Sequence, residues 1–281
     1  MIFVIGSITT NVLLLLWLRL LQVPTPALVT LNYFVCVALS AIIEAPRASA
    51  LQTIEPFSLL ILGVLGVLFI SVFMLTGEAA RTIGIGLTGM LAKLSVILPI
   101  GFSALFLREP ISPRQAAGLF IGLGAIVIIH MPYLRRDTGK SLFQALRMGG
   151  LLWLGNGIID ILFKSFQPTW RSLSPLHVPL MIMSVAGILG ILWHMYHSKL
   201  NQLVGSRIWL SALLLGGTNL LSIYFYLRGL EALPAVQFFL WNNLGIVLLS
   251  GIVGVVLFRE EFSWEVGVGY LLGVIAIVLT A

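Results

Sequence analysis

A six-residue motif occurs twice in this chain, and the two copies are separated by 151 residues. The first copy is LREPIS at 107–112, and the second is FREEFS at 258–263. At the same offset two glycine pairs align, Gly118 with Gly269 and Gly122 with Gly273. A repeat of half the chain length indicates a fold built from two related halves.

Apolar segments of membrane-spanning length fill most of the sequence. A helix needs about 20 residues to cross roughly 30 Å of hydrocarbon. Ten stretches approach that length: 2–21, 27–43, 57–77, 83–107, 115–131, 148–166, 176–196, 208–227, 234–258 and 264–280. Only 9% of the residues are charged, against about 25% in soluble domains. We therefore expect an all-α integral membrane protein with ten transmembrane helices.

Other features of the composition exclude several classes of protein. The first stretch lacks a basic region before it and a small-residue cleavage site after it, so we expect a retained helix rather than a signal peptide. One cysteine, Cys36, rules out an internal disulfide and a thiolate metal cluster. The net charge of +6 comes from basic residues scattered singly through short loops, which favours anionic lipid headgroups over nucleic acid as partners.

The most polar connection lies at 132–147 and divides the chain into two sets of five stretches. We predict a first five-helix repeat at 1–131 and a second at 148–281, joined by this linker. Because five is odd, the second set enters the membrane in the opposite direction from the first. The predicted fold is therefore a pair of inverted-topology repeats, between which a central site can open to either side.

The two motif copies, each a charged hairpin followed by a glycine-rich span, resemble the EamA-like branch of the drug/metabolite transporter superfamily. The resemblance covers essentially the whole chain. It implies proton-linked or exchange transport of amino acids, nucleotide sugars, drugs or other metabolites, in a bacterial inner membrane. It also implies cytoplasmic termini, whereas nine basic residues in the loops of one side against five on the side of the termini favour termini outside. The orientation stays open.

Lys93 carries a charge deep in the stretch 83–107. It lies within one turn of the midpoint, so the nearest interface is about 15 Å away at 1.5 Å per residue. A lysine side chain does not snorkel that far. The ammonium must therefore face a wet cavity or a partner, either as a contact for an anionic substrate group or in a switchable ion pair. The alternative is a permanent pair that only holds helices together.

Asp160 is the expected partner of Lys93, because it lies near the centre of stretch 148–166. Lys164 follows four residues later on the same helical face and offers a local partner instead. We predict that Asp160 carries the coupled proton, with its affinity tuned by burial and by one of these lysines. Lys164 is also a candidate for proton coupling, although its place near the helix end allows it to reach water.

Amides stand at the corresponding depth in the second half. Asn242 and Asn243, beside Trp241, align through the repeat with the segment that ends in Lys93. Polar groups at matching depth are what a site between two repeats needs, so we predict that all three residues line it. An interhelical amide hydrogen bond is the alternative interpretation.

Two further polar faces are candidates for the cavity lining. Asn219, Ser222 and Tyr226 follow helical spacing on stretch 208–227, and Asn11 is polar within the first stretch. Ordinary hydrogen bonding between helices would give the same pattern.

The remaining polar signals favour structural roles. Glu109 and Glu260 are expected to accept hydrogen bonds from the amino terminus of the next helix. The glycine pairs permit close helix packing, either within the chain or in a homodimer. His194 and His197 lie at a span end without further ligands in sequence, so we expect interfacial placement and no metal site. Motifs for a nucleophile elbow, phosphate loop or zinc protease are absent from the sequence, so we expect no enzyme and no cofactor.

These observations predict a secondary transporter that moves a small polar metabolite by alternating access. Its predicted site comprises Lys93, Asp160, Asn242, Asn243, Trp241, Tyr226, Asn219 and Asn11. A flippase for lipid-linked substrates, with a cavity open sideways to lipid, and a non-transporting membrane scaffold are the alternatives. The substrate, the coupling ion, the direction of transport and the oligomeric state do not follow from the sequence.

Overall fold

The computed structural model of the chain describes residues 1–44, 55–82, 85–136, 142–174, 176–259 and 263–281. Within these ranges the secondary structure is helical, and no strand occurs. The α-helices are α1 (Ile2–Leu20), α2 (Thr25–Glu44), α3 (Pro56–Thr82), α4 (Ile85–Leu94), α5 (Ile97–Leu105), α6 (Pro113–Arg136), α7 (Leu142–Phe166), α8 (His177–Tyr196), α9 (Ser206–Ala232), α10 (Ala235–Phe258) and α11 (Trp264–Thr280). Two 3-10 helices, η2 (Thr169–Ser172) and η3 (Leu200–Leu203), lie in connections.

These helices are long and apolar enough for a membrane. In the described ranges nine segments could each cross a bilayer, and α11 adds a shorter apolar helix of 17 residues. Large apolar side chains are exposed on the outer faces of the helices, among them Leu105, Phe120 and Val256. Apolar surface on this scale suits lipid rather than water. The chain is a multi-pass membrane protein.

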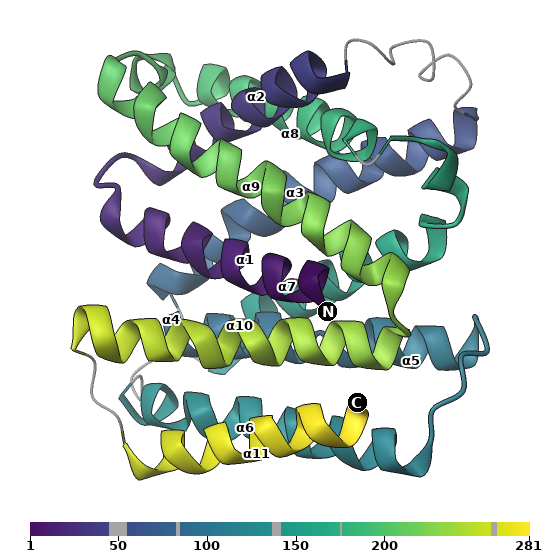
Figure 1. Ribbon diagram of the computed structural model, residues 1–281. Helices are drawn as coiled ribbons and strands as arrows, with labels where there is room; N and C mark the ends of the chain where they lie inside the picture. The colour runs from purple at the N-terminus through teal and green to yellow at the C-terminus, as the bar shows by residue number, and fades with distance from the viewer. Residues whose placement is uncertain (45–54, 83–84, 137–141, 175, 260–262) are drawn as a thin grey trace. The chain divides into compact units, whose positions relative to one another are not determined.

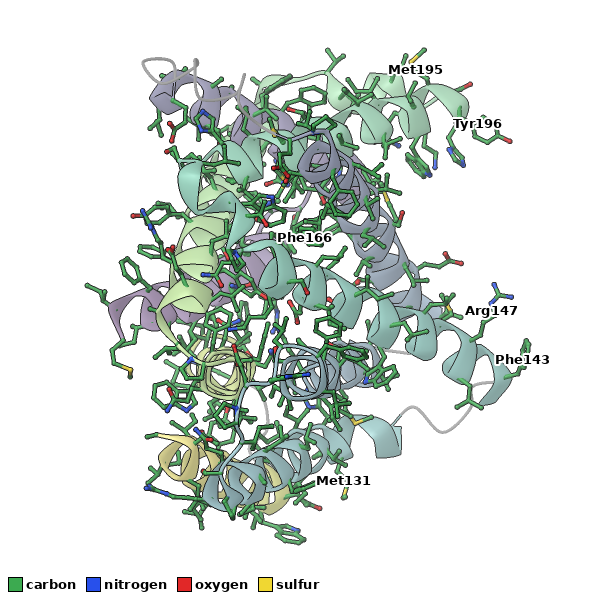
Figure 2. The ribbon with its side chains drawn as sticks, turned by 90° about the vertical axis from the view of Figure 1, so that its right-hand side faces the viewer. Met131, Phe143, Arg147, Phe166, Met195 and Tyr196 are labelled. Atoms are coloured by element: carbon green, nitrogen blue, oxygen red, sulfur yellow. The ribbon has the colours of Figure 1, made fainter. Side chains whose placement is uncertain are left out.

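Helix ends carry aromatic and basic side chains together. Met195 and Tyr196 project from the carboxyl end of α8, and Phe143 and Arg147 project from the amino-terminal part of α7 (Figure 2). Tyr196 is 86% exposed. Aromatic and basic side chains at such positions are typical of the membrane–water interface.

The described chain divides into two compact units, and each is described by itself. Unit 1 comprises Met1–Met74 and Ser165–Glu231, and unit 2 comprises Leu75–Lys164 and Ala232–Ala281. Each unit therefore takes segments from both halves of the sequence, and the units do not coincide with the two predicted repeats.

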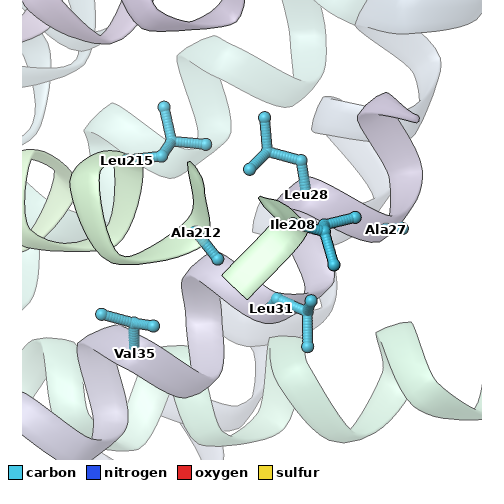
Figure 3. Close-up of a cluster of buried hydrophobic side chains, with 7 residues drawn as sticks. All are labelled: Ala27, Leu28, Leu31, Val35, Ile208, Ala212 and Leu215. Atoms are coloured by element: carbon cyan, nitrogen blue, oxygen red, sulfur yellow. The ribbon is translucent and has the colours of Figure 1, made fainter. Parts of the chain in front are cut away.

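The core of unit 1 forms where α2 meets α9. Small and branched apolar side chains from the two helices meet in one buried cluster: Ala27, Leu28, Leu31, Val35, Ile208, Ala212 and Leu215 (Figure 3). Helix α8 packs along α2 in the same unit. Glycine permits that approach at Gly190, where an added Cβ would lie 2.6 Å from the Thr30 hydroxyl oxygen.

Unit 2 is built around the antiparallel pair α6 and α11, which lie side by side (Figure 1). An added Cβ on Gly118 would lie 2.7 Å from Thr280 Cγ2 and 3.0 Å from the Ala276 carbonyl oxygen. An added Cβ on Gly269 would lie 2.5 Å from Ile129 Cγ1 and 3.2 Å from the carbonyl oxygen of Ala125. The glycine pairs that align in sequence thus lie on the contact between these two helices, as intramolecular packing predicts.

The residues that face Gly269 and the residues that face Gly118 correspond to each other through the repeat. Adding 151 to 125 and 129 gives 276 and 280, the positions that Gly118 meets. Gly118 and Gly269 therefore occupy equivalent positions on opposite sides of one helix contact.

The repeated motif has the same backbone features in both copies. Arg108 and Arg259 each adopt a left-handed conformation, with φ of 54° and 52°. Four residues later, Ser112 and Ser263 accept hydrogen bonds from the main-chain N–H of Gln115 and Val266. Arg259 is the C-cap of α10, whereas Arg108 lies three residues after the end of α5, and in both copies the serine caps the helix that follows.

The predicted stretch 83–107 is the one that departs most from the sequence-based expectation. It contains two helices, α4 and α5, rather than one continuous span. Helix α10, which corresponds to it through the repeat, runs unbroken. The difference follows from Pro99, since the repeat places Ser250 at the equivalent position.

Candidate functional site

The break between α4 and α5 centres on Ser95 and Val96. Pro99 has no N–H to bond the carbonyl oxygen of Ser95, and its ring crowds the preceding turn, which favours a break at this point. The N–H of Leu98 bonds to the carbonyl oxygen of Ser95 at 2.9 Å, which is the spacing of a tighter turn. The Leu94 carbonyl oxygen instead accepts a hydrogen bond of 3.2 Å from Trp153 Nε1 on α7.

The broken helix is therefore held by side chains at the carbonyl groups that it exposes. Ser95 Oγ donates to the carbonyl oxygen of Ala92 at 2.7 Å. Unwound backbone within a membrane-spanning segment is tolerated where protein groups or a cavity satisfy it. Discontinuous helices of this kind form the substrate and ion sites of many transporters.

Lys93 occupies the last turn of α4, beside this break. Its side chain is partly exposed. A positive charge at the carboxyl end of a helix is favoured by the helix dipole. The position of Lys93 thus combines an intramembrane charge with an irregular backbone.

Asp160 on α7 interacts electrostatically with Lys93. The two residues belong to different helices of unit 2, and the sequence predicted this pairing. Opposite charges in a membrane-spanning segment offset the free energy that either one alone would cost there.

Lys164, the alternative partner of Asp160, has a different role. Its Nζ lies 2.7 Å from Glu109 Oε1, and only 9% of the side chain is exposed. The other carboxylate oxygen of Glu109 accepts the main-chain N–H of Ala235, at the start of α10, at 2.9 Å. Lys164 and Glu109 thus tie the hairpin after α5, the end of α7 and the start of α10 together.

This arrangement corrects the predicted capping of the next helix by Glu109. The amino terminus of α6 is capped by Ser112, and Glu109 caps α10 instead. Sequence distance misled the prediction, because the helix start that receives the carboxylate lies more than a hundred residues along the chain. Glu260 lies outside the described residues.

The three predicted residues of α10 are buried in this conformation. Trp241 Nε1 donates to Thr280 Oγ1 on α11 at 2.8 Å. Asn243 Nδ2 donates to the Phe239 carbonyl oxygen of its own helix at 2.9 Å, and Asn242 is 4% exposed. The Trp241 bond joins two helices, whereas the Asn243 bond stays within α10.

The predicted lining residues of unit 1 form bonds between helices. Asn11 Nδ2 on α1 donates to Ser222 Oγ on α9 at 2.9 Å. Asn219 Nδ2, also on α9, donates to Asn32 Oδ1 on α2 at 3.0 Å. Tyr226, one turn beyond Ser222, is partly exposed. The sequence thus identified polar helix faces that do meet.

His130 on α6 is a candidate residue that the sequence did not reveal. Its Nδ1 lies 2.7 Å from the carbonyl oxygen of Ile126, and its ring interacts electrostatically with Lys93. Lys93, Asp160 and His130 therefore bring three ionisable groups from three helices to one region of unit 2. A histidine at the end of an apolar stretch is usually interpreted as lying at the membrane–water interface. The sequence therefore did not indicate His130 as a site residue.

Unit 1 holds a second ionisable pair that the sequence did not reveal. Glu44, at the end of α2, and His177, at the start of α8, are both buried, with 3.9 Å between Oε2 and Nε2. Ser174 Oγ donates to the other carboxylate oxygen of Glu44. The sequence does not indicate that Glu44 and His177 meet, because they lie at the ends of two apolar stretches that are far apart in the chain.

The histidines predicted at an interface differ in burial. His197 is exposed, whereas His194 is fully buried, and its Nδ1 lies 2.8 Å from the Gly190 carbonyl oxygen. The described residues contain no cluster of three histidine, cysteine or acidic side chains with a metal-binding arrangement.

Comparison with known proteins shows the fold and leaves the activity open. No protein-family profile matches the chain. An uncharacterized protein of Haemophilus influenzae is 26% identical over 204 residues, which cover 71% of this chain and 67% of that protein. A crystal structure described only as that of a protein superposes with a TM-score of 0.79, at 19% identity, over 99% of this chain and 96% of the other. The chain shares the fold of that structure.

Proposed function

We propose that this chain is a secondary transporter that moves a small polar metabolite across a membrane by alternating access. The observation that carries the proposal is Lys93, an intramembrane cation at a helix break with Asp160 beside it. Charges within spanning segments mark substrate or ion pathways. A broken helix supplies polar backbone at the same place.

An inverted repeat would give the two alternating states, and three features of the chain support one. The contacts of Gly118 and Gly269 exchange under the offset of 151 residues. Arg108 and Arg259 share a left-handed backbone, and Ser112 and Ser263 both cap the helix that follows. Two copies of one repeat would keep the same local geometry at corresponding positions.

In this proposal Lys93 contacts an anionic group of the substrate, and Asp160 balances the lysine charge between transport events. The buried residues Trp241, Asn242 and Asn243 would reach the substrate only in another conformation. Asn11, Asn219 and Tyr226 remain predictions from the sequence. Because Lys164 is paired with Glu109, we assign it to holding the helices rather than to proton coupling.

The cellular setting follows from the resemblance to the EamA-like branch. It places the transporter in a bacterial inner membrane, without a cofactor. A homodimer is part of the same proposal. Since Gly118 and Gly269 are occupied by contacts within unit 2, a dimer would use another face.

A thermal-shift screen of the purified protein against amino acids, organic acids and sugar phosphates tests the proposal. A metabolite that raises the melting temperature of the natural protein should fail to do so after Lys93→Ala. Lys199→Ala is the matched control, because Lys199 is exposed and lies over the Trp193 ring at 5.3 Å. Uptake of the same metabolite into reconstituted vesicles should be lost in the Lys93 variant alone. Equal uptake by both variants would remove Lys93 from the site.

A further inference from the structure

We propose that the connection between α8 and α9 binds the phosphate of an anionic phospholipid, with Lys199 and Arg207 as its contacts. The connection contains the 3-10 helix η3 and belongs to unit 1. The ligand is a lipid of the surrounding membrane, so the proposal goes beyond the proposed transport and does not depend on it.

The acidic residues of unit 1 lie away from this connection. The sequence of the unit contains three, Glu44, Glu55 and Glu231. Glu44 ends α2 and meets His177, with which α8 begins. Glu231 lies in the last turn of α9, where it pairs with Arg228 at 3.0 Å. Both carboxylates are therefore a helix length away from the connection, which follows the end of α8 and precedes the start of α9.

Glu55 is also distant from the connection. It comes directly before α3, and Phe57 in the first turn of α3 packs on Phe166, with 5.7 Å between the ring centroids. Phe166 ends α7, from which a short segment leads to the start of α8. None of the three carboxylates of unit 1 thus lies at the end where α8 is followed by α9.

The end of unit 1 that holds the connection carries basic groups instead. Helix η3 packs on α2 and α8. Leu203 of η3 packs against the buried cluster of Figure 3, as do Leu21 and Val23 between α1 and α2. The end of α1, the start of α2 and the α8–α9 connection therefore lie together. The basic residues in these segments are Arg19, His197, Lys199 and Arg207.

The end of α8 directs Lys199 over an aromatic ring. Ser198 has a left-handed φ of 52°, and the main-chain N–H of Lys199 bonds the His194 carbonyl oxygen at 2.8 Å. The Nζ atom of Lys199 lies 5.3 Å from the centroid of the Trp193 ring. His197 packs on the same indole, with 4.3 Å between ring centroids. The cation–π contact restrains the ammonium, so Lys199 presents a positive charge at a defined place.

Both cations are accessible to a ligand. Lys199 and Arg207 are exposed, and the ion pairs among the described residues involve neither of them. Arg207 lies in the first turn of α9. Lysine and arginine both bind phosphate through charge-assisted hydrogen bonds.

Apolar side chains flank the two cations and favour a lipid over a soluble anion. Met195 and Tyr196 project outward at the end of α8 (Figure 2), and Val204, between the cations in sequence, is 78% exposed. Trp209 is exposed near the start of α9. Side chains of this kind enter the boundary between headgroups and acyl chains. The phosphodiester of a phospholipid lies at the same depth, within reach of the lysine and the arginine.

The net charge of the headgroup decides which lipid binds. Phosphatidylcholine carries a quaternary ammonium group that the two cations repel, whereas phosphatidylglycerol has no compensating cation. Each basic residue near an anionic surface raises the affinity by a factor of about five. We therefore expect the natural protein to bind phosphatidylglycerol at least about tenfold more tightly than phosphatidylcholine.

Native mass spectrometry of the purified protein in a neutral detergent counts the bound lipids, and the two probes carry identical acyl chains. Lys199→Gln and Arg207→Gln should each weaken the tightest binding of phosphatidylglycerol by about fivefold, and the double variant by about 25-fold. Arg228→Gln is the matched control, because it removes the same charge at the other end of α9 and should leave this affinity unchanged. Lys199→Arg with Arg207→Lys keeps both charges and should bind as the natural protein does.

Four results would overturn the proposal. Unchanged affinity in the double variant would remove the two side chains from the site. Equal binding of the two lipids would exclude recognition of the headgroup charge. An equal loss in Arg228→Gln would show an effect of net charge rather than of a site. Glycerol phosphate that displaces phosphatidylglycerol at equal concentration would assign the site to a soluble anion. The melting temperature in lipid-free detergent should be the same for all variants, since the two side chains are exposed.

These measurements are separate from the test of transport. Lys93 belongs to unit 2, and vesicles of phosphatidylcholine alone offer no anionic lipid to the connection. Lys199→Ala therefore remains a control for uptake in such vesicles. Loss of uptake on changing Lys93 without selective binding of phosphatidylglycerol would leave the transporter and reject the lipid site, and the converse result would reject the transporter alone.

Discussion

The Trp153 indole on α7 donates its hydrogen to the carbonyl oxygen of Leu94, the residue with which α4 ends. One side chain thus compensates a main-chain carbonyl whose helical partner, the N–H of Leu98, bonds the Ser95 carbonyl oxygen instead. The bond connects the backbone next to Lys93 to the helix that carries Asp160.

Replacing Trp153 by Phe should lower both stability and transport. The Leu94 carbonyl would lose its donor, which costs about 1–2 kcal/mol in a buried setting. Thermal denaturation in detergent and uptake into vesicles measure the two effects. Trp209→Phe is the control, since that indole is 47% exposed and belongs to unit 1. Equal behaviour of the two variants would contradict a role for this bond.

Pro99→Ala should make the α4–α5 segment more regular. With an N–H at position 99 the helix could bond back to Ser95, and an interior proline costs roughly 3 kcal/mol relative to alanine. We expect the melting temperature to stay or rise while uptake falls, because Lys93 would no longer stand beside a break. Full transport activity in this variant would show that the break is dispensable.

Lys93→Ala and Lys93→Ala with Asp160→Asn should separate stability from function. The single variant leaves the Asp160 carboxylate without its partner, and breaking a buried pair costs about 3–5 kcal/mol, less where water reaches it. The double variant removes both charges and should recover most of that loss. Uptake should be absent in both. A double variant that transports normally would leave the pair with a purely structural role and would favour a scaffold.

Glu109→Gln and Lys164→Met should each destabilise unit 2, by about 2 kcal/mol. Each leaves the other partner with an uncompensated charge at the junction of three segments. The double variant should be destabilised by less than the sum of the single changes, since the two residues are coupled. Denaturation of all four proteins gives the coupling energy directly, and strict additivity would argue against the ion pair.

Gly118→Ala and Gly269→Ala should destabilise the protein by similar amounts, about 1–3 kcal/mol each. In both cases the new methyl group meets atoms of the facing helix closer than 3.0 Å. Gly124→Ala on α6 is the matched control, because an added Cβ there meets nothing within 4 Å. That control should be neutral or slightly stabilising, since alanine favours helices. Markedly unequal effects at the two glycines would argue against equivalent positions.

Hydropathy predicted the helices closely, because a membrane span must be both apolar and helical. Stretch 2–21 is α1 (Ile2–Leu20), and stretch 234–258 is α10 (Ala235–Phe258). Helix ends were less predictable. Stretch 208–227 ends five residues before α9 does, since the segment Arg228–Ala232 is polar yet continues the helix, with Arg228 and Glu231 paired at 3.0 Å.

Within the site, the sequence predicted the pairing of Lys93 with Asp160 because each is an ionisable residue in the middle of an apolar stretch. The role of Lys164 was not predictable, since its partner Glu109 stands in a hairpin of the other half. The break before Pro99 has a signal in sequence, a proline near the middle of a span, but proline is also common in unbroken membrane helices. His130 required the packing of α4 on α6.

A spanning segment made of two short helices has a mechanical consequence. Bending usually requires main-chain bonds to break, but at Ser95 and Val96 the regular ladder is already interrupted. The ten residues of α4 could therefore swing against the nine of α5 at little energetic expense. Lys93 would move with α4, and it lies within three residues of the point at which the segment would bend.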